Sequence, residues 1–247
     1  MKVTFLGTNG WYDTATGNTV CILIETEQYD IVLDAGNGIH KLDRYISGRK
    51  PVFIFLSHFH LDHIAGLHIL GKFKFEKGLT ICGPEGTKKV LSVLISQPFT
   101  MPFSELDYRT DILELPVERE KLPFDITALP LRHSSLTLGY RFHIDGKTVA
   151  YCPDTGYCEN ALKLAFSADL LITECAYRPG QIVESWPHLN PETAARIAEE
   201  ANVKKLHLVH FDASLYPTLA NRQLAELTAR RVFPNTVASL DDMQVEI

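Results

Sequence analysis

Three histidines and an aspartate, His58, His60, Asp62 and His63, fall within six consecutive positions of the sequence. They directly follow the apolar run at residues 51–56. Imidazole nitrogens and carboxylate oxygens are ligands that suit zinc and manganese. A lone histidine is more often a hydrogen-bonded core or surface residue, but four such groups together favour a metal site. Because four ligands cannot all reach one tetrahedral ion and leave room for water, the spacing predicts two ions.

The apolar run at residues 51–57 predicts a buried strand, which places the cluster at its carboxyl end and in the following loop, where functional sites commonly lie. Alternating or apolar segments that end in Gly, Asn or Asp predict further strands at residues 3–7, 19–36, 124–153, 168–174 and 204–211, the second of them a hairpin turning near 27–30. Helices are expected at 83–96, with Pro84 at the first helical position, and at 159–166, 190–202 and 216–231. No repeat, linker or charge block marks a boundary, so we expect a single domain over residues 1–247, built from two β-then-α halves.

The composition narrows the classes of function. The chain has 24 basic and 30 acidic residues and a net charge of −6, so no overall positive field attracts nucleic acid or an anionic membrane. Its five cysteines form no C-x-x-C pair, which argues against a disulfide framework and a cysteine-based zinc module. No apolar run approaches the roughly 20 residues that span a bilayer, and no signal peptide is recognised. We therefore expect a cytoplasmic protein with no membrane partner.

The H-x-H-x-D-H motif at residues 58–63 resembles the signature of the metallo-β-lactamase-fold hydrolases. Later segments resemble that family's other motifs in the same order: VLDAG with Asp34, LRHSSLTLGY with His133, AYCPDTG with Asp154 and LVHFD with His210. These motifs run from residue 34 to 212, which is most of the chain. The resemblance implies an α/β fold of the α+β type, arranged as a four-layer αββα sandwich.

The same resemblance implies a set of ligands for two divalent metal ions, Zn²⁺ or alternatively Mn²⁺. One ion would be held by His58, His60 and His133. The other would be held by Asp62, His63 and His210, with Asp154 between the two ions. Asp34 would brace the metal-binding loop through hydrogen bonds. The histidines outside the motifs are expected to be structural or surface residues without a part in the site: His40, His68, His143 and His207.

Two further segments, LLITECAY and WPHLNPETAARIAEEANVKKLHLVHFD, resemble the ribonuclease Z-like branch of phosphodiesterases. By that resemblance, Glu174 orients His188, and His188 donates a hydrogen bond or a proton to the departing oxygen. Taken alone, Glu174 could simply close a strand and His188 could simply cap a helix. A hydroxide shared by two ions is a nucleophile at neutral pH, and Asp62 is expected to help orient it.

The transfer-RNA-processing members of that branch carry a long basic arm between the motifs of His133 and Asp154, where this chain has only 20 residues. These are nearly consumed by two strands and a turn at Asp145-Gly146. Without the arm, structured RNA is a poor substrate and a small phosphodiester, above all a cyclic nucleotide, is favoured. The alternatives are a ribonuclease Z-type endonuclease, a thioester or lactone hydrolase of the same fold, and a metal-stabilised binding module.

Residues 96–111 contain two prolines and the large side chains of Phe99, Met101, Phe103 and Tyr108. This segment is the sequence's candidate for a substrate wall that stacks on a base, or for the contact of a homodimer. Basic side chains at residues 71–89 would form a modest RNA-facing patch if they gathered beside the site. We expect a homodimer, since relatives without the arm commonly pair.

Overall fold

The computed structural model describes residues 1–247 and contains two large sheets. The first has the strand order β15-β1-β3-β4-β5-β6-β7. Its strands are β1 (Lys2–Gly7), β3 (Cys21–Glu25), β4 (Asp30–Leu33), β5 (Val52–Phe55), β6 (Leu79–Pro84), β7 (Thr110–Leu115) and β15 (Gln244–Glu246). The second has the order β14-β12-β11-β10-β9-β8. Its strands are β8 (Asp125–Pro130), β9 (Leu138–Ile144), β10 (Lys147–Cys152), β11 (Leu170–Glu174), β12 (Leu206–Val209) and β14 (Thr236–Ala238).

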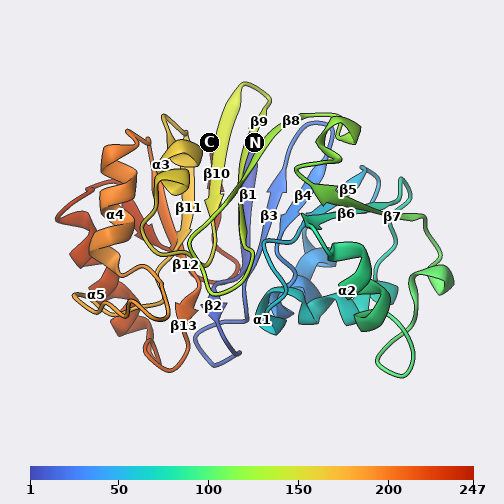
Figure 1. The fold of residues 1–247 in the computed structure, drawn as a ribbon, viewed down its shortest axis with the longest axis horizontal. Helices are drawn as coiled ribbons and strands as arrows, with labels where there is room; N and C mark the ends of the chain where they lie inside the picture. Colours follow the sequence, from blue (N-terminus) through green and yellow to red (C-terminus); the bar gives the residue numbers. More distant parts are fainter.

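Helices cover the outer face of each sheet. Figure 1 shows α3 (Glu159–Ala165), α4 (Pro191–Glu200) and α5 (Leu219–Arg230) on the side of the second sheet, and α1 (Leu61–Ile64) and α2 (Thr87–Leu94) on the side of the first. A small sheet pairs β2 (Asn9–Gly10) with β13 (Phe211–Asp212). Four 3₁₀ segments complete the structure: η1 (Asn37–Arg44), η2 (Ala65–Lys72), η3 (Phe103–Glu105) and η4 (Arg119–Lys121). None of the helices combines the length and the apolar character needed to cross a membrane.

Three apolar cores separate four layers. One core joins the two sheets and contains Phe5, Phe55 and Tyr140, all fully buried. A second lies between the second sheet and its helices, and a third between the first sheet and its helices. The predicted four-layer αββα sandwich is therefore confirmed. Because the central core takes side chains from both sheets, we infer that the two halves form one domain.

Local sequence explains the elements that were predicted. The helix α4 begins after Asn190, whose side chain accepts a hydrogen bond from the backbone N–H of Thr193, and Pro191 occupies the first helical position. The hairpin of β9 and β10 turns at Asp145 and Gly146, with φ of 52° and 68°. This left-handed pair matches the twist of the strands that it joins.

One helix start was wrong, and four strands of three or more residues were not predicted. Pro84 ends β6 instead of beginning a helix, and α2 starts at Thr87 after Gly86, which has a φ of 94°. β6 pairs with β7 as far as Pro84, so residues 83–84, which were expected to be helical, belong to a strand. The unpredicted strands are β6, β7, β14 and β15; the last returns the end of the chain to β1.

The parallel strands determine where the candidate site lies. Asp34 follows β4 and His58 follows β5 at neighbouring positions of the first sheet. In the second sheet, Asp154 follows β10 and His210 follows β12, and β11 lies between these two strands. Because parallel strands end at the same edge of a sheet, these side chains from distant parts of the chain meet where the two sheets adjoin.

A candidate metal centre between the sheets

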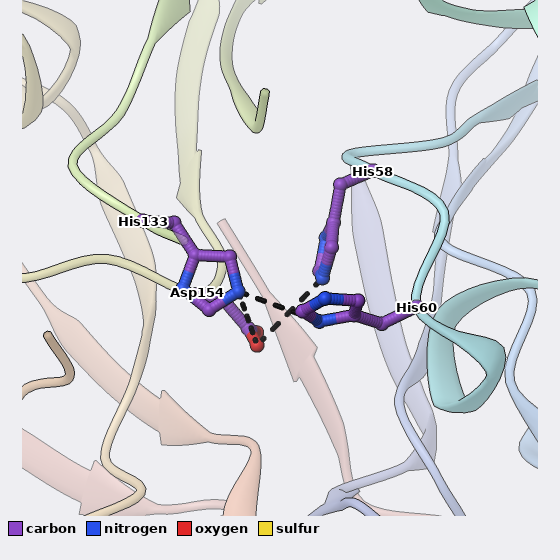
Figure 2. A group of neighbouring side chains, drawn as sticks. All are labelled: His58, His60, His133 and Asp154. Atoms are coloured by element: carbon purple, nitrogen blue, oxygen red, sulfur yellow. Dashed lines mark hydrogen bonds and ion pairs between the residues drawn. The ribbon is translucent and has the colours of Figure 1, made fainter. Parts of the chain in front are cut away.

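Seven predicted ligands gather into two groups that share one region. The first group contains His58, His60, His133 and Asp154, and the second contains Asp62, His63 and His210. Within each group the candidate ligand atoms lie within 4.8 Å of one another. Figure 2 shows the first group: the imidazoles of His58 and His60 come from one side, that of His133 comes from the other, and the carboxylate of Asp154 lies between them.

The carboxylate of Asp154 faces both groups, one oxygen to each. Its Oδ2 lies 3.8 Å from Nε2 of His58 and 3.7 Å from Nε2 of His133. Its Oδ1 lies 3.2 Å from Nε2 of His63 and 3.1 Å from Nε2 of His210. A carboxylate that presents a different oxygen to each of two ligand sets has the arrangement that bridging requires.

A buried hydrogen-bond network behind the site fixes two imidazoles. Oδ2 of Asp34 accepts from Nδ1 of His63 at 2.8 Å, from the Ser57 hydroxyl at 2.9 Å and from the Tyr151 hydroxyl at 2.6 Å. Because the Ser57 hydroxyl donates to Asp34, its oxygen can accept from Nδ1 of His58 at 2.9 Å. Both rings therefore carry their proton on Nδ1 and leave Nε2 free to bind a metal. The bracing role expected of Asp34 agrees with this geometry.

The pKa values of the first ligand group favour binding of a cation. Burial lowers the pKa of His58 well below its usual range, with repulsion from His63 in the same direction. Burial likewise lowers the pKa of His133 to about 4. Burial raises the pKa of Asp154, but the facing imidazoles of His210 and His63 outweigh it and hold this pKa well below its usual range. The first group thus offers neutral imidazoles and an ionised carboxylate.

The second group attracts positive charge. Burial lowers the pKa of His63, yet Asp154, Asp62 and Asp34 together raise it well above its usual value. Burial also raises the pKa of Asp62, but His63 and His210 bring it below its usual value. Carboxylates that favour a proton on a neighbouring imidazole favour a metal cation in the same place, so binding of a metal releases protons.

The donor atoms fit a metal centre on a further test. Nε2 of His58 is fully buried and makes no hydrogen bond within the protein. Buried polar atoms without a partner are costly, and one common reason for their presence is an ion. Imidazole and carboxylate donors suit zinc and manganese, so the residues fit the pair of divalent ions that the sequence predicts.

His188 lies beside the ligands and is held by a carboxylate. Its Nδ1 donates to Oε1 of Glu174 at 2.6 Å, and its ring stacks near that of His210 with centroids 6.0 Å apart. The Glu174 carboxylate is fully buried and also accepts from the backbone N–H of Thr155 and of Ala176. Burial lowers the pKa of His188, but Glu174 outweighs it and raises the pKa to about 9. The structure thus brings together the predicted pair of His188 and Glu174.

A pocket opens over the site. Its volume is about 370 Å³, and it is lined by His60, Asp62, Asp154, His188 and His210 together with Gly10, Trp11, Ala176, Trp186 and Asp212. The residues not anticipated from the sequence are the two tryptophans, Gly10, Ala176 and Asp212. A signal was available for Trp186, which stands two positions before His188 in the SWPHLN segment.

Residues 96–111, expected to form a substrate wall, do not line the pocket of this chain, and their expected part in a homodimer contact stays a prediction. The segment instead packs beside η2: the Thr100 hydroxyl donates to the carbonyl of His68, and the Tyr108 hydroxyl donates to that of Leu70. Phe99 contributes to a separate apolar groove with Phe59 and residues of α2. The basic side chains at residues 71–89 do not line the pocket either.

The remaining histidines lie apart from the pocket. His40 and His68 each place Nδ1 within hydrogen-bond distance of a carbonyl three residues earlier in the chain. His143 contacts the Thr148 hydroxyl, and His207 is buried against Phe5 with its Nδ1 3.0 Å from the Ser239 hydroxyl.

Comparison with known proteins decides the family. Residues 29–211 match the model of the beta-lactamase superfamily domain, and this range contains every residue of both ligand groups. The chain belongs to the β-lactamase superfamily. A probable metallo-hydrolase, YhfI of Bacillus subtilis (strain 168), is 31% identical over 219 residues, covering 85% of this chain and 88% of the relative. The chain is accordingly a metal-dependent hydrolase, and membership implies that it binds divalent metal.

One further relative and the crystal structure of YhfI place the chain within the superfamily. A ribonuclease Z of Lacticaseibacillus casei (strain BL23) is 27% identical to this chain, and the alignment covers 100% of this chain and 95% of the ribonuclease Z. The crystal structure of the Bacillus subtilis YhfI protein superposes with a TM-score of 0.81 at 26% identity, covering 100% of this chain and 98% of that one. The alignment with the ribonuclease Z extends over 308 positions against 247 residues here, so that relative has segments without a counterpart in this chain. The resemblance to a ribonuclease Z-like branch without the arm is confirmed.

Proposed function

We propose that this protein is a metal-dependent phosphodiesterase that hydrolyses small phosphodiesters, cyclic nucleotides foremost. The observation that carries the proposal is the position of His188 beside a carboxylate, Asp154, that faces two ligand groups at once. A poor alkoxide leaving group needs a proton donor next to the metals, and His188 with Glu174 supplies one. Relatives named ribonuclease Z support cleavage of a phosphodiester bond.

The proposed division of labour follows the geometry. When bound, two divalent ions would supply a water of lowered pKa and would neutralise negative charge on the phosphodiester. His58, His60 and His133 would hold one ion, and Asp62, His63 and His210 the other, with Asp154 shared. Asp62 would also help orient the attacking water, because its Oδ2 lies at the pocket and is held by the backbone N–H of Trp11 at 2.7 Å. His188 would protonate the departing oxygen, and Glu174 would keep its ring in place.

A small substrate is favoured by the pocket and by the segment that joins His133 to Asp154. A volume of about 370 Å³ falls in the range of small-molecule sites. The residues between His133 and Asp154 form β9, a two-residue turn and β10, which leaves no chain for an RNA-binding arm. The chain's net charge of −6 also provides no broad positive surface for RNA. Zinc or manganese as the metal, a homodimer and a cytoplasmic location stay predictions from the sequence.

A ribonuclease Z-type endonuclease is the second candidate, because relatives of that name match over the whole of this chain. Assays with a 3′,5′-cyclic mononucleotide and with a precursor transfer RNA, side by side at physiological salt, separate the two. We expect metal-dependent opening of the cyclic nucleotide and an essentially uncut RNA, with Asp154→Asn inactive on both. Efficient RNA cleavage with an inert cyclic nucleotide would overturn the proposal in favour of the second candidate.

A further inference from the structure

Both tryptophans of the chain line the pocket over the metal centre. Trp11 is 66% exposed and Trp186 is 48% exposed, although large aromatic side chains normally contribute to cores and interfaces. Most of the other lining side chains are the histidines and carboxylates of the site, and the third apolar one is the small Ala176. The two tryptophans are therefore the large apolar residues that line this pocket.

Trp186 lies over the first ligand group. Its ring is nearly parallel to that of His60, with centroids 6.2 Å apart and an interplanar angle of 8°. It meets His133 edge-on, with centroids 5.9 Å apart and an angle of 70°. It also lies 6.4 Å from the ring of His188, so the indole forms a wall beside both the ligands and the proton donor.

Trp11 lies beside the second ligand group, where its backbone holds it, and its ring meets that of Tyr12 edge-on with centroids 5.2 Å apart. Its N–H donates to Oδ2 of Asp62 at 2.7 Å, and its φ is 72°, a conformation that a bulky residue rarely adopts. The preceding Gly10 packs against the ring of His210 so closely that a Cβ would lie 2.5 Å from it. The side chain of Asn9 closes the loop by donating to the carbonyls of Tyr12 and Gly17. Unfavourable backbone geometry that the surroundings enforce is typical of functional positions.

We propose that Trp11 and Trp186 are two walls of a specificity pocket that holds a planar nucleobase of the substrate. Indole faces stack on any heteroaromatic ring, so such a pocket selects nucleotides over phosphodiesters without a base. The histidines and carboxylates that line the rest of the pocket, with the cations that they would hold, would receive the phosphodiester. This inference rests on the proposed function, because it assumes that the phosphodiester is cleaved at the metal centre.

Fluorescence tests the pocket without any catalysis. Because the chain has only two tryptophans, Trp11→Phe leaves Trp186 as the only indole emitter and Trp186→Phe leaves Trp11. Each variant is titrated with adenosine 5′-monophosphate and with ribose 5-phosphate, with the protein stripped of metal by a chelator and again with zinc restored. We expect the nucleotide to change the emission of each remaining tryptophan and the base-free ligand to leave both unchanged. Equal responses to the two ligands, or a response of one tryptophan alone, would overturn the two-walled pocket.

Kinetics provides the second measurement. Trp11→Ala and Trp186→Ala should each lower kcat/KM for a cyclic nucleotide by about 5- to 100-fold, mainly through KM, as expected for loss of a stacked base. On a base-free cyclic ribose phosphate the same two variants should lose distinctly less kcat/KM, so the preference of the enzyme for the substrate with a base should fall. Phe at either position should restore much of the loss. Phe166→Ala removes an aromatic side chain that is 64% exposed outside the pocket, so it controls for loss of exposed aromatic surface.

The two proposals fail in different ways. If no phosphodiester is hydrolysed but the base-dependent fluorescence change persists, the pocket stands and the proposed function is wrong. If phosphodiesters with and without a base are hydrolysed equally well in the wild type and in both alanine variants, the proposed function stands and the base pocket is overturned. Circular dichroism and metal content of each variant establish that a lost signal does not come from a lost fold.

Discussion

Nδ1 of His63 lies 2.8 Å from Oδ2 of Asp34, and both side chains are fully buried. This contact fixes the ring so that Nε2 points to the carboxylate of Asp154, 3.2 Å away. The same Asp34 oxygen also accepts from the Tyr151 hydroxyl of the neighbouring sheet. The orientation of His63 thus depends, through Asp34, on the Tyr151 hydroxyl. Tyr151 itself neither lines the pocket nor belongs to a ligand group.

Tyr151→Phe should therefore weaken metal binding while leaving all seven proposed ligands in place. Loss of a partner behind a metal ligand typically lowers affinity by about 10- to 100-fold. Tyr140→Phe is a matched control, since Tyr140 is equally buried and its hydroxyl donates to the carbonyl of Leu56 instead of to a carboxylate. Competition with a chromophoric chelator measures the affinity. Equal losses in the two variants would show that the Tyr151 contact has no special part in metal binding.

The two ligand groups predict close to two divalent ions per chain under metal-replete conditions. Asp154→Asn should reduce this content and abolish turnover, because an amide offers only one oxygen and no charge to share between the groups. Elemental analysis of the purified protein checks the stoichiometry. Full activity with a single ion would contradict the dinuclear site.

Gly10→Ala should disturb the second ligand group, because Gly10 packs against His210 although the two residues are far apart in the sequence. Its Cβ would lie 2.5–2.8 Å from three atoms of the His210 ring, so the ring or the loop must move. We expect loss of one ion and a large loss of activity. Gly71→Ala is the control, because its Cβ would meet the flexible side chain of Met101 at 3.4 Å. Unchanged metal content in Gly10→Ala would mean that the loop yields without moving His210.

The sequence predicted much of this site because its motifs are local or fall at strand ends. His58, His60, Asp62 and His63 are adjacent in the chain, and strand periodicity places them at the carboxyl end of β5. Asp34, Asp154 and His210 were assigned only through resemblance, since nothing local indicates that the ends of β4, β10 and β12 meet. The geometry brings all of them together, and their metal-binding role stays a prediction until ions are measured.

The pocket walls were not predictable from local pattern. Trp11 reaches the site through a left-handed backbone conformation, which periodicity and propensity do not reveal for a tryptophan. The segment at residues 96–111 had the aromatic composition of a wall, but its hydrogen bonds to η2 direct it elsewhere. Composition identifies side chains that can stack, whereas tertiary contacts decide which of them do.

His207 should make stability depend on pH. Burial, with a smaller effect of Lys205, lowers its pKa to about 4, and the ring stacks on Phe5 with centroids 5.0 Å apart. The unfolded chain, with an ordinary pKa of about 6.5, binds the proton more readily. Stability is therefore complete above about pH 6.5 and falls as the pH drops toward 4.

His207→Gln should remove this dependence. Between pH 7 and pH 5 the wild type should lose about 2 kcal/mol more of its free energy of unfolding than the variant, from the difference in pKa. Urea unfolding at the two pH values measures both losses, and any contribution of the metal centre is common to the two proteins. Parallel losses would mean that the folded protein accommodates the charged ring.

His188→Ala should separate the proton donor from the ligands. His188 is held by Glu174 at 2.6 Å and belongs to neither of the two proposed ligand groups, although its ring also lies close to Asp154 and His210. The variant should therefore keep its full metal content, while turnover of a substrate with a poor alkoxide leaving group falls by roughly 10²–10⁴-fold, the usual span for loss of a general acid. An activated aryl phosphodiester, whose leaving group needs little protonation, should suffer much less. Glu174→Gln should show a weaker form of the same dependence on the leaving group. This variant keeps the imidazole of His188 but loses the negative charge of Glu174 that raises the pKa of His188. Equal losses on both substrates would show that His188 positions the substrate without acting as the acid.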